Sequence, residues 1–308
     1  MIKELQGFIR RNIKRWEKRY PGNLTGLQVA NKRVRGKRTP EYSIVFHVDK
    51  KIPENELHPR SRLPKYITLR RKGRKTGRQV ATDVIEVSAG RFRSGGAVAP
   101  VLPGDVAKEI GAQDFGSIGP VLEKDGTYYV LSNMHVLGVS RLDAGIFNAT
   151  LGSAQPNIAL GDGRIVASFT RGMLHPLLDA AIARIEDATL LQPVIPGFGV
   201  PKGARIVGPQ DVRPEGYRTH LVGALTRVAG RVVDNAAFKV FETRWGRITF
   251  YNLLQVAPNI GRDGDSGGTF IGPDKKVLGI LLGSDNAYSY AIPIGAITGT
   301  FRVNLFVQ

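Results

Sequence analysis

The sequence predicts a mainly β chain, folded as a sandwich or a pair of barrels and preceded by a small basic α+β unit. Two observations carry this prediction. Beyond about residue 115, short apolar runs of β-type composition alternate with glycine and turn residues, with hardly any helical periodicity. Before residue 94, one helix pattern and a few strand patterns occupy a segment that holds nearly all of the net positive charge.

The first residues predict an amphipathic helix over residues 2–20. Apolar side chains recur every three or four positions, basic residues fill the rest of the surface, and Pro21-Gly22-Asn23 ends the pattern. The apolar stripe consists of Ile2, Leu5, Phe8, Ile9, Ile13, Trp16 and Tyr20.

Strand patterns and a change of composition then suggest how the chain is divided. The strands expected after the helix are Gly26–Asn31, Tyr42–Val48 and Val80–Val87. A stretch rich in Gly, Ser, Ala and Pro follows them and predicts a linker. We therefore expect a basic α+β unit of residues 1–88, a linker of residues 89–110 and a β-rich unit of residues 111–308.

The β-rich unit shows about a dozen short strand patterns separated by turns. Asp125-Gly126 lies between two of them and favours a tight hairpin. The expected strands include Gly116–Leu122, Tyr128–Leu131, Arg164–Thr170, Asp179–Ile185, Arg205–Val207, Thr226–Val233, Ile248–Val256, Gly268–Ile271, Val277–Leu282 and Tyr288–Ile294.

The net charge of +18 is concentrated in the N-terminal part. Residues 1–93 hold 25 Lys and Arg and 8 Asp and Glu, a balance of +17, and residues 94–308 hold the other 19 and 18. Dense basic charge attracts phosphates without sequence preference, so nucleic acid or another polyanion is a candidate partner of residues 1–93, as is an anionic membrane surface. The alternative is a solvated charged face on a helix whose apolar stripe packs inward.

The residue types also limit the compartment and the chemistry. The chain has no cysteine, which excludes disulfides and thiolate metal sites. It has no apolar run that suits a signal peptide or a membrane span. We expect a cytoplasmic protein with no transmembrane segment. No cluster of His, Asp and Glu has metal-ligand spacing, so we expect neither a catalytic metal nor a cofactor.

One glycine-rich segment, Gly264-Asp265-Ser266-Gly267-Gly268, has the composition of a nucleophile loop. Hydrolysis of an amide by serine needs a nucleophile, a base, a group that orients the base and backbone donors for the oxyanion. Gly264 allows a turn in which its own N–H and that of Ser266 point into one small space. The glycines after Ser266 leave its hydroxyl accessible. The alternative is a glycine-rich β-turn with a surface serine.

Two other residues supply the base and the orienting acid. His135 directly follows a strand pattern, and Asp179 begins the apolar strand Asp179–Ile185. The order His, Asp, Ser, with each residue at a strand edge, is the order of one known serine-hydrolase triad. His175 is followed by Pro176 in a loop, and we interpret it as structural or exposed. A strand-edge aspartate that caps a turn is the alternative for Asp179.

These motifs resemble the trypsin/chymotrypsin-like serine peptidase superfamily over roughly residues 110–300. Gly264–Gly268 is similar to its nucleophile motif, Leu131–Leu137 to its histidine segment, and Asp179–Ile182 to its aspartate segment. The downstream strands resemble the disulfide-free bacterial members. The end of the N-terminal part, Thr82–Val87, resembles bacterial and plant proteins related to the plant narrow-leaf protein.

The resemblance implies two six-stranded antiparallel β-barrels with a His135, Asp179 and Ser266 triad in the cleft between them. It implies a serine endopeptidase whose substrate is a protein or peptide. Ser266 would attack the carbonyl and His135 would transfer its proton, while Asp179 fixes the histidine tautomer. The N–H groups of Gly264 and Ser266 would form the oxyanion hole.

The resemblance also indicates the substrate pocket, which the superfamily builds from residues before the nucleophile and from two later strands. The predicted pocket residues are Ile260, Gly261, Leu281, Leu282, Gly283 and Tyr290. None carries a charge that would partner a buried Arg or Lys. We therefore expect a preference for small or medium apolar residues before the scissile bond.

Two questions about activity stay open in the sequence. In the digestive members, the aspartate that matches Asp265 pairs with a new N-terminus, yet this chain shows no matching start near residues 88–120. Either the oxyanion loop is preformed or something else, such as the N-terminal unit, orders it. The second question is activity itself, because a catalytically inactive, protease-like binding module recruited to a polyanion is the alternative to an active endopeptidase.

Overall fold

The computed structural model describes residues 1–20, 23–34, 37–53, 56–57, 62–69, 77–87, 90–92, 104–150, 157–188, 192–212 and 215–307. The helices are α1 (Ile2–Arg19), α2 (Met134–Leu137), α3 (Val139–Asp143) and α4 (Ile294–Phe301). The strands are β1 (Leu24–Val34), β2 (Lys37–Val48), β3 (Tyr66–Leu69), β4 (Arg78–Glu86), β5 (Gly90–Phe92), β6 (Val106–Glu109), β7 (Gly116–Ser117), β8 (Leu122–Lys124), β9 (Thr127–Ser132), β10 (Asn148–Thr150), β11 (Ile158–Leu160), β12 (Ile165–His175), β13 (Leu178–Ile185), β14 (Tyr217–Val222), β15 (Arg227–Thr243), β16 (Gly246–Ala257), β17 (Thr269–Ile271), β18 (Val277–Ser284), β19 (Ser289–Pro293) and β20 (Asn304–Leu305).

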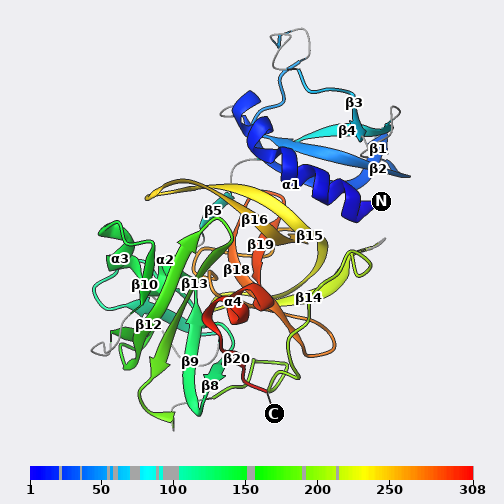
Figure 1. Ribbon diagram of the computed structural model, residues 1–308. Coiled ribbons are helices and arrows are strands. Elements are labelled where there is room, and N and C mark those ends of the chain that lie inside the picture. Colours follow the sequence, from blue (N-terminus) through cyan, green and yellow to red (C-terminus); the bar gives the residue numbers. More distant parts are fainter. Residues whose placement is uncertain are drawn as a thin grey trace.

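The chain is mainly β, as the sequence predicts, and its sheets curl into barrel-like forms (Figure 1). One sheet contains nine of the described strands in the order β20-β8-β9-β13-β12-β11-β6-β7, with β10 beside β12. The predicted hairpin at Asp125-Gly126 is confirmed, because Lys124 pairs with Thr127 and both turn residues have positive φ, 50° and 73°. This sheet carries β9 and β13, the strands that lead to the predicted histidine and aspartate.

The second sheet contains eleven of the described strands and includes the predicted nucleophile loop between β16 and β17. Its order is β14-β17-β18-β19-β16-β15-β1-β2-β4-β3, and β14 also pairs with β15. This extra pairing closes β14, β17, β18, β19, β16 and β15 into a ring. Side chains such as Phe270, Leu281 and Val256 fill one of its apolar clusters.

The N-terminal strands extend this second sheet, since β1 pairs antiparallel with both β2 and β15. Helix α1 covers them (Figure 1), and its predicted apolar stripe is buried against residues such as Leu27, Phe46 and Phe238. The basic side chains of α1 are exposed on its other face: Lys3, Arg10, Arg11, Lys14, Arg15, Lys18 and Arg19. Helix periodicity therefore places apolar groups inward and charge outward.

Three predicted elements differ from the structure. Residues 89–110, expected to be a linker, include β5, which pairs with β15 and β18, and β6, which pairs with β7 and β11. Backbone pairing decides these short strands, and the Gly-, Ser-, Ala- and Pro-rich composition of residues 88–104 conceals it. Residues 88–89 and 93–103 of this region lie outside the described residues. The expected strand Gly116–Leu122 is divided into β7 and the start of β8.

The expected strand Arg205–Val207 is wrong. Only an isolated bridge between Ala204 and Val277 forms there, and the side chain of Ile206 is 85% exposed. The Arg205 guanidinium instead bonds to Asp211 and Asp274, which holds the segment as a connection.

His47 on β2 lies at the junction of the N-terminal strands with the second sheet. It is buried and stacks on Tyr288, with ring centroids 5.9 Å apart. Neither ring nitrogen has a hydrogen-bond partner among the described residues. Burial, reinforced by the positive charge of Lys239, lowers the pKa of His47 to about 3.

This histidine should make the folded chain sensitive to acid. Below about pH 6.5 the unfolded chain binds a proton at His47 that the folded chain does not, so folding stability falls as pH falls, until about pH 3. We expect His47→Leu to remove about 1.4 kcal/mol of this loss per pH unit. Urea unfolding of both chains between neutral pH and about pH 4 measures the difference. Other titrating groups, such as buried Asp234, contribute equally to both chains and cancel in this difference. If the free energies of unfolding of the two chains change in parallel with pH, the lowered pKa of His47 is contradicted.

Candidate active site

The three predicted catalytic residues come from both sheets. His135 lies on α2, directly after β9, and Asp179 is the second residue of β13, the neighbour of β9. Ser266 lies in the loop before β17 of the other sheet. The exposed fractions of the three residues are 2%, 0% and 0%, so all three are buried.

The structure brings His135 and Asp179 into direct contact. The Oδ2 atom of Asp179 bonds to Nδ1 of the His135 ring. Its other oxygen, Oδ1, accepts the backbone N–H of Met134 at 2.8 Å and that of His135 at 3.3 Å. Asn133 Nδ2 donates to the Asp179 carbonyl at 2.8 Å. The carboxylate therefore fixes both the ring and the first turn of α2, whose N–H groups have no partner within the helix.

Glycine and backbone hydrogen bonds shape the loop that carries Ser266. Gly264 and Gly267 have φ values of 98° and 88°, a region that other residues rarely adopt. The N–H groups of Asp265 and Gly268 donate to the carbonyls of Arg262 and Asp265, at 3.0 and 2.8 Å. Ser266 Oγ donates to the carbonyl of Leu282 on β18, at 3.4 Å.

Ser117 connects this loop to the strand that leads to the histidine. Its N–H donates to the Ser266 carbonyl at 2.7 Å, and its hydroxyl donates to the Gly264 carbonyl at 2.9 Å. Its own carbonyl accepts the hydroxyl of Ser132, the last residue of β9, at 2.7 Å. Ser117 could not be identified from the sequence, because no local motif marks a serine whose partner Gly264 lies 147 residues away.

The neighbouring Gly116 lies where the two halves of the site approach most closely. A methyl group at this position would lie 2.5 Å from Val136 Cγ2 and 2.6 Å from the Ser266 carbonyl oxygen. Val136 is the residue after His135, and Ser266 is the predicted nucleophile. Gly116 therefore lets the histidine helix and the nucleophile loop meet.

Gly116→Ala should separate these two segments. We expect a loss of stability of about 1–3 kcal/mol from overpacking. We also expect a fall of about 100-fold in kcat/KM, because a displacement of about 1 Å between reacting groups has that effect. Urea unfolding and peptide hydrolysis measure the two quantities. Gly299→Ala is the matched control, since a methyl group there meets nothing within 4 Å and adds helix propensity to α4. Equal activity of the two variants would contradict the close approach.

The buried Asp265 already has partners within its own region. Its Oδ1 accepts the N–H of Leu225 and its Oδ2 that of Arg262, each at 2.9 Å. Two backbone donors from separate loops thus hold the carboxylate that, in the digestive relatives of the resemblance, pairs with a new N-terminus. A preformed loop is the alternative from the sequence analysis that these contacts favour.

The predicted pocket residues lie near the nucleophile loop but do not form one uniform surface. The N–H groups of Ile260 and Gly261 both donate to Ser289 Oγ at 3.0 Å. Leu281, Leu282 and Tyr290 are fully buried in apolar clusters. Gly283 on β18 pairs with Phe92 of β5. Their role as a substrate pocket stays a prediction.

A buried ion pair lies at the end of β18, the strand that carries the predicted pocket residues Leu281, Leu282 and Gly283. Lys239 Nζ lies 2.8 Å from Asp285 Oδ2, and both side chains have 0% exposure. The Tyr290 hydroxyl donates to the same oxygen at 2.8 Å. Burial lowers the pKa of Lys239, and burial together with Asp285 raises that of Tyr290 well above its ordinary value. Of these three residues, only Tyr290 was predicted to take part in the site, as a pocket residue.

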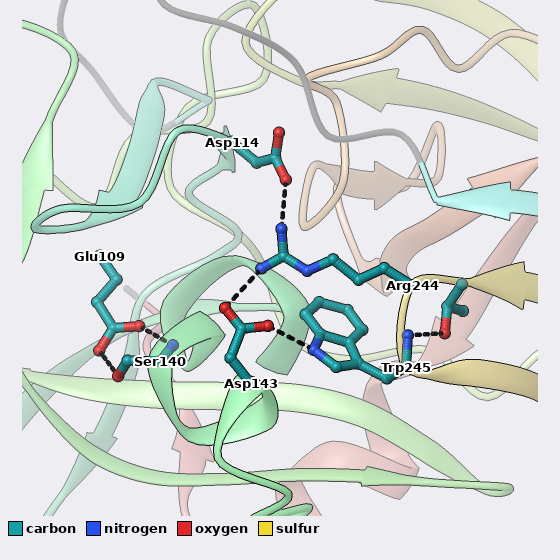
Figure 2. Close-up of polar contacts among 7 residues, drawn as sticks. Glu109, Asp114, Ser140, Asp143, Arg244 and Trp245 are labelled. Carbon is teal, nitrogen blue, oxygen red and sulfur yellow. Dashed lines mark hydrogen bonds and ion pairs between the residues drawn. The ribbon is translucent and has the colours of Figure 1, made fainter.

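Figure 2 shows a second connection between the two sheets, at the tip of the β15–β16 hairpin. Arg244 bonds to Asp114 and Asp143, at 3.2 Å each, and Trp245 Nε1 donates to Asp143 at 2.8 Å. Asp143 ends α3, the helix that follows the histidine helix, and Glu109 holds the first turn of α3 through Ser140. We call these contacts the hairpin clamp. It fastens the second sheet to the segment after His135.

In the part of the chain that the structure describes, no three His, Asp or Glu side chains are grouped as metal ligands. None of the helices in the same residues has both the length and the apolar character to cross a membrane.

Comparisons with known proteins find similarity only at the level of structure. No known family model and no curated protein matches the chain. Among solved structures it is similar to a glutamic acid-specific serine protease, at 19% identity and a TM-score of 0.48, over 67% of this chain and 100% of that one. It is similar to Nocardiopsis protease, at 17% identity and a TM-score of 0.46, over 67% of this chain and 99% of that one. It is also similar to Thermobifida fusca protease A, at 16% identity and a TM-score of 0.45, over 68% of this chain and 100% of that one.

Proposed function

We propose that the chain is a serine endopeptidase that hydrolyses peptide bonds through an acyl-enzyme intermediate. The observation that carries the proposal is the buried pair in which Asp179 binds both His135 Nδ1 and the backbone that positions the histidine. Ser117 and Gly116 join that assembly to the loop of Ser266. A carboxylate, an imidazole and a serine hydroxyl in this order supply the acid, base and nucleophile that the reaction needs.

In the proposed mechanism, Ser266 Oγ attacks the peptide carbonyl while His135 Nε2 takes the hydroxyl proton. His135 then gives this proton to the leaving amine, and the acyl group stays on Ser266. Water repeats the sequence and releases the acid. Asp179 holds the proton on Nδ1, so that Nε2 is the basic nitrogen. The N–H groups of Gly264 and Ser266 stabilise the oxyanion, each by about 3 kcal/mol.

The finer features of the resemblance belong to the same proposal. The closed ring of β14 to β19 supports one six-stranded barrel, and the sheet that carries His135 would form the other. The absence of cysteine supports a cytoplasmic compartment. The uncharged residues around Ile260 support a preference for small or medium apolar residues before the scissile bond. Similarity of the N-terminal part to the narrow-leaf group stays a prediction.

Digestion of a proteome-derived peptide library, with the new termini identified by mass spectrometry, tests both reaction and specificity. We expect cleavage after residues such as Ala, Val or Leu, with modest discrimination. Dominant cleavage after Arg or Lys would contradict the predicted apolar pocket, while the assignment of the catalytic triad would still stand. Peptide binding without any cleavage would favour the inactive binding module.

We also propose that the basic face of α1 binds polyanions. Its exposed face carries seven Lys and Arg, while the apolar stripe is buried against β1 and β2. We expect duplex DNA to bind at about 50 mM salt and to dissociate as salt rises, since phosphate contacts release counterions. Substitution of Arg10, Arg11, Lys14 and Arg15 by Gln should weaken binding and reduce the salt slope. An affinity for duplex DNA that does not fall as the salt concentration rises would contradict the proposal.

A further inference from the structure

The end of β18 is paired on both edges, and one of its partners comes from the N-terminal half of the chain. Strand β19 pairs with one edge of Gly283 and Ser284. Strand β5 pairs antiparallel with the other edge, with Phe92 opposite Gly283 and Arg91 opposite Ser284. The last two residues of β18 therefore have no open edge.

The edge that β5 covers is the edge on which the nucleophile lies. Along this edge, Gly267 N donates to the Leu281 carbonyl at 2.9 Å, and Leu281 N donates to the Gly268 carbonyl at 2.8 Å. The next residue, Leu282, accepts the hydroxyl of Ser266. Because β19 covers the opposite edge, β5 continues the nucleophile's edge directly beyond Leu282.

A peptide that reacts with Ser266 needs this same edge. Its carbonyl carbon must approach Oγ to about 3–3.5 Å. Extended peptides commonly bind by adding a strand to a sheet edge, where main-chain hydrogen bonds supply the affinity. Beside Ser266, the backbone groups suited to such pairing are those of β18 from Leu282 to Ser284.

We propose that β5 is an internal occupant of this peptide-binding edge, so that the chain restricts access to its own site until β5 leaves. The inference rests on the proposed peptidase function and adds its regulation. The backbone N–H groups of Leu225 and Arg262 already hold Asp265 and so order the nucleophile loop. Activity would then be controlled by access of the substrate to the site and not by ordering of this loop. The question left by the sequence, how activity is controlled without a new N-terminus, then has a structural answer.

A second contact holds β5 in place. Its other edge pairs in parallel with β15, with Gly90 opposite Phe241 and Arg91 opposite Glu242. Glu242 lies two residues before Arg244, whose clamp fastens the same hairpin to the histidine side (Figure 2). Strand β5 thus lies between β18 and the hairpin that bridges the two sheets (Figure 1).

Release of β5 is the first test. Adjacent residues of a strand direct their N–H groups to opposite edges, so either Arg91 or Phe92 directs its N–H toward β18. Proline has no N–H, so the double substitution Arg91→Pro with Phe92→Pro removes that donor in either case. Arg91→Ala with Phe92→Ala is the matched control, because it removes the side chains and keeps both N–H groups. We expect the proline pair to react with a fluorophosphonate probe about 5- to 10-fold faster than the unsubstituted chain, and the alanine pair at the unsubstituted rate. Equal rates for both pairs would overturn the proposal.

The second test holds β5 on β18 with a disulfide instead of releasing it. This test does not depend on whether the chain folds with proline in β5. The chain has no cysteine, so Arg91→Cys with Ser284→Cys introduces two thiols that face each other across the ladder and have no competitor. We expect the oxidised chain to label about 10-fold more slowly than the same chain after reduction. Single-cysteine variants, unaffected by reductant, are the controls. Failure of the disulfide to form, or equal rates before and after reduction, would overturn the proposal.

Peptide binding separates this inference from the peptidase function itself. In the Ser266→Ala background, the probe is a fluorescein-labelled peptide with the sequence of residues 88–96, Ser-Ala-Gly-Arg-Phe-Arg-Ser-Gly-Gly. We expect its Kd to be at least about 5-fold lower for the proline pair than for the parent. If no chain reacts with the fluorophosphonate, the peptidase function fails, and the peptide measurement still decides whether β5 covers the edge. An unchanged Kd would overturn the inference alone.

Discussion

Ser266→Ala should abolish fluorophosphonate labelling and lower kcat for peptide hydrolysis by on the order of 10⁶-fold, because the variant has no atom to form the acyl bond. Stability should change by only about 1 kcal/mol. The substitution removes one hydroxyl, which donates to the Leu282 carbonyl at 3.4 Å, and leaves the backbone bonds of the loop intact. Labelling measured by gel fluorescence, with urea unfolding in parallel, tests both statements.

The matched control is Ser168→Ala. Ser168 is also buried, and its hydroxyl bonds to Glu186, which follows the end of β13 opposite to Asp179. It should lose some stability and keep its labelling. If the Ser266 variant still hydrolyses peptides at the unsubstituted rate, the nucleophile has been assigned wrongly, and the proposed function fails with it.

What the sequence predicted well is what short segments decide locally. The hairpin at Asp125-Gly126 follows from two residues that accept positive φ, and α1 follows from a helical period of apolar side chains. The contact of His135 with Asp179 was expected from the order His, Asp, Ser at strand edges and from the resemblance that these motifs carry. In each case the signal lies within a few residues, or within a motif whose spacing implies the fold.

What the sequence did not predict depends on contacts between distant segments. Ser117 bonds to Gly264, and Arg244 bonds to Asp114 and Asp143, across more than 100 residues. Nothing in the composition near Ser117 or Arg244 marks these partners. Strand β5 was expected to be linker because residues 88–104 are rich in Gly, Ser, Ala and Pro, yet its pairing uses backbone groups that any residue carries. The wrong strand at Arg205 is the converse error, since only an isolated bridge forms beside it, with Ile206 exposed and Val207 buried.

The second large effect concerns Asp179, whose two carboxylate oxygens have different partners. Oδ2 binds His135 Nδ1, and Oδ1 accepts two backbone N–H groups, from Met134 and His135. A carboxylate can accept hydrogen bonds from all three N–H groups, the ring Nδ1–H and the two backbone N–H groups. An amide has one acceptor oxygen and one donor nitrogen. Asp179→Asn must therefore fail at one of its two positions.

The backbone contacts decide which position fails. Placing the amide nitrogen against Met134 N–H and His135 N–H would oppose two donors with a donor, so we expect the amide oxygen to stay there and the NH₂ group to face Nδ1. Nδ1 must then be an acceptor, which moves the ring proton to Nε2, the nitrogen that has to take the proton from Ser266. We expect kcat to fall about 10⁴-fold with KM little changed. Nitrogen-15 NMR of the imidazole should show the exchanged tautomer, and Asp274→Asn, at a half-buried ion pair with Arg205, should show neither effect. A variant with full kcat, or with the proton still on Nδ1, would show that Asp179 does not orient the base.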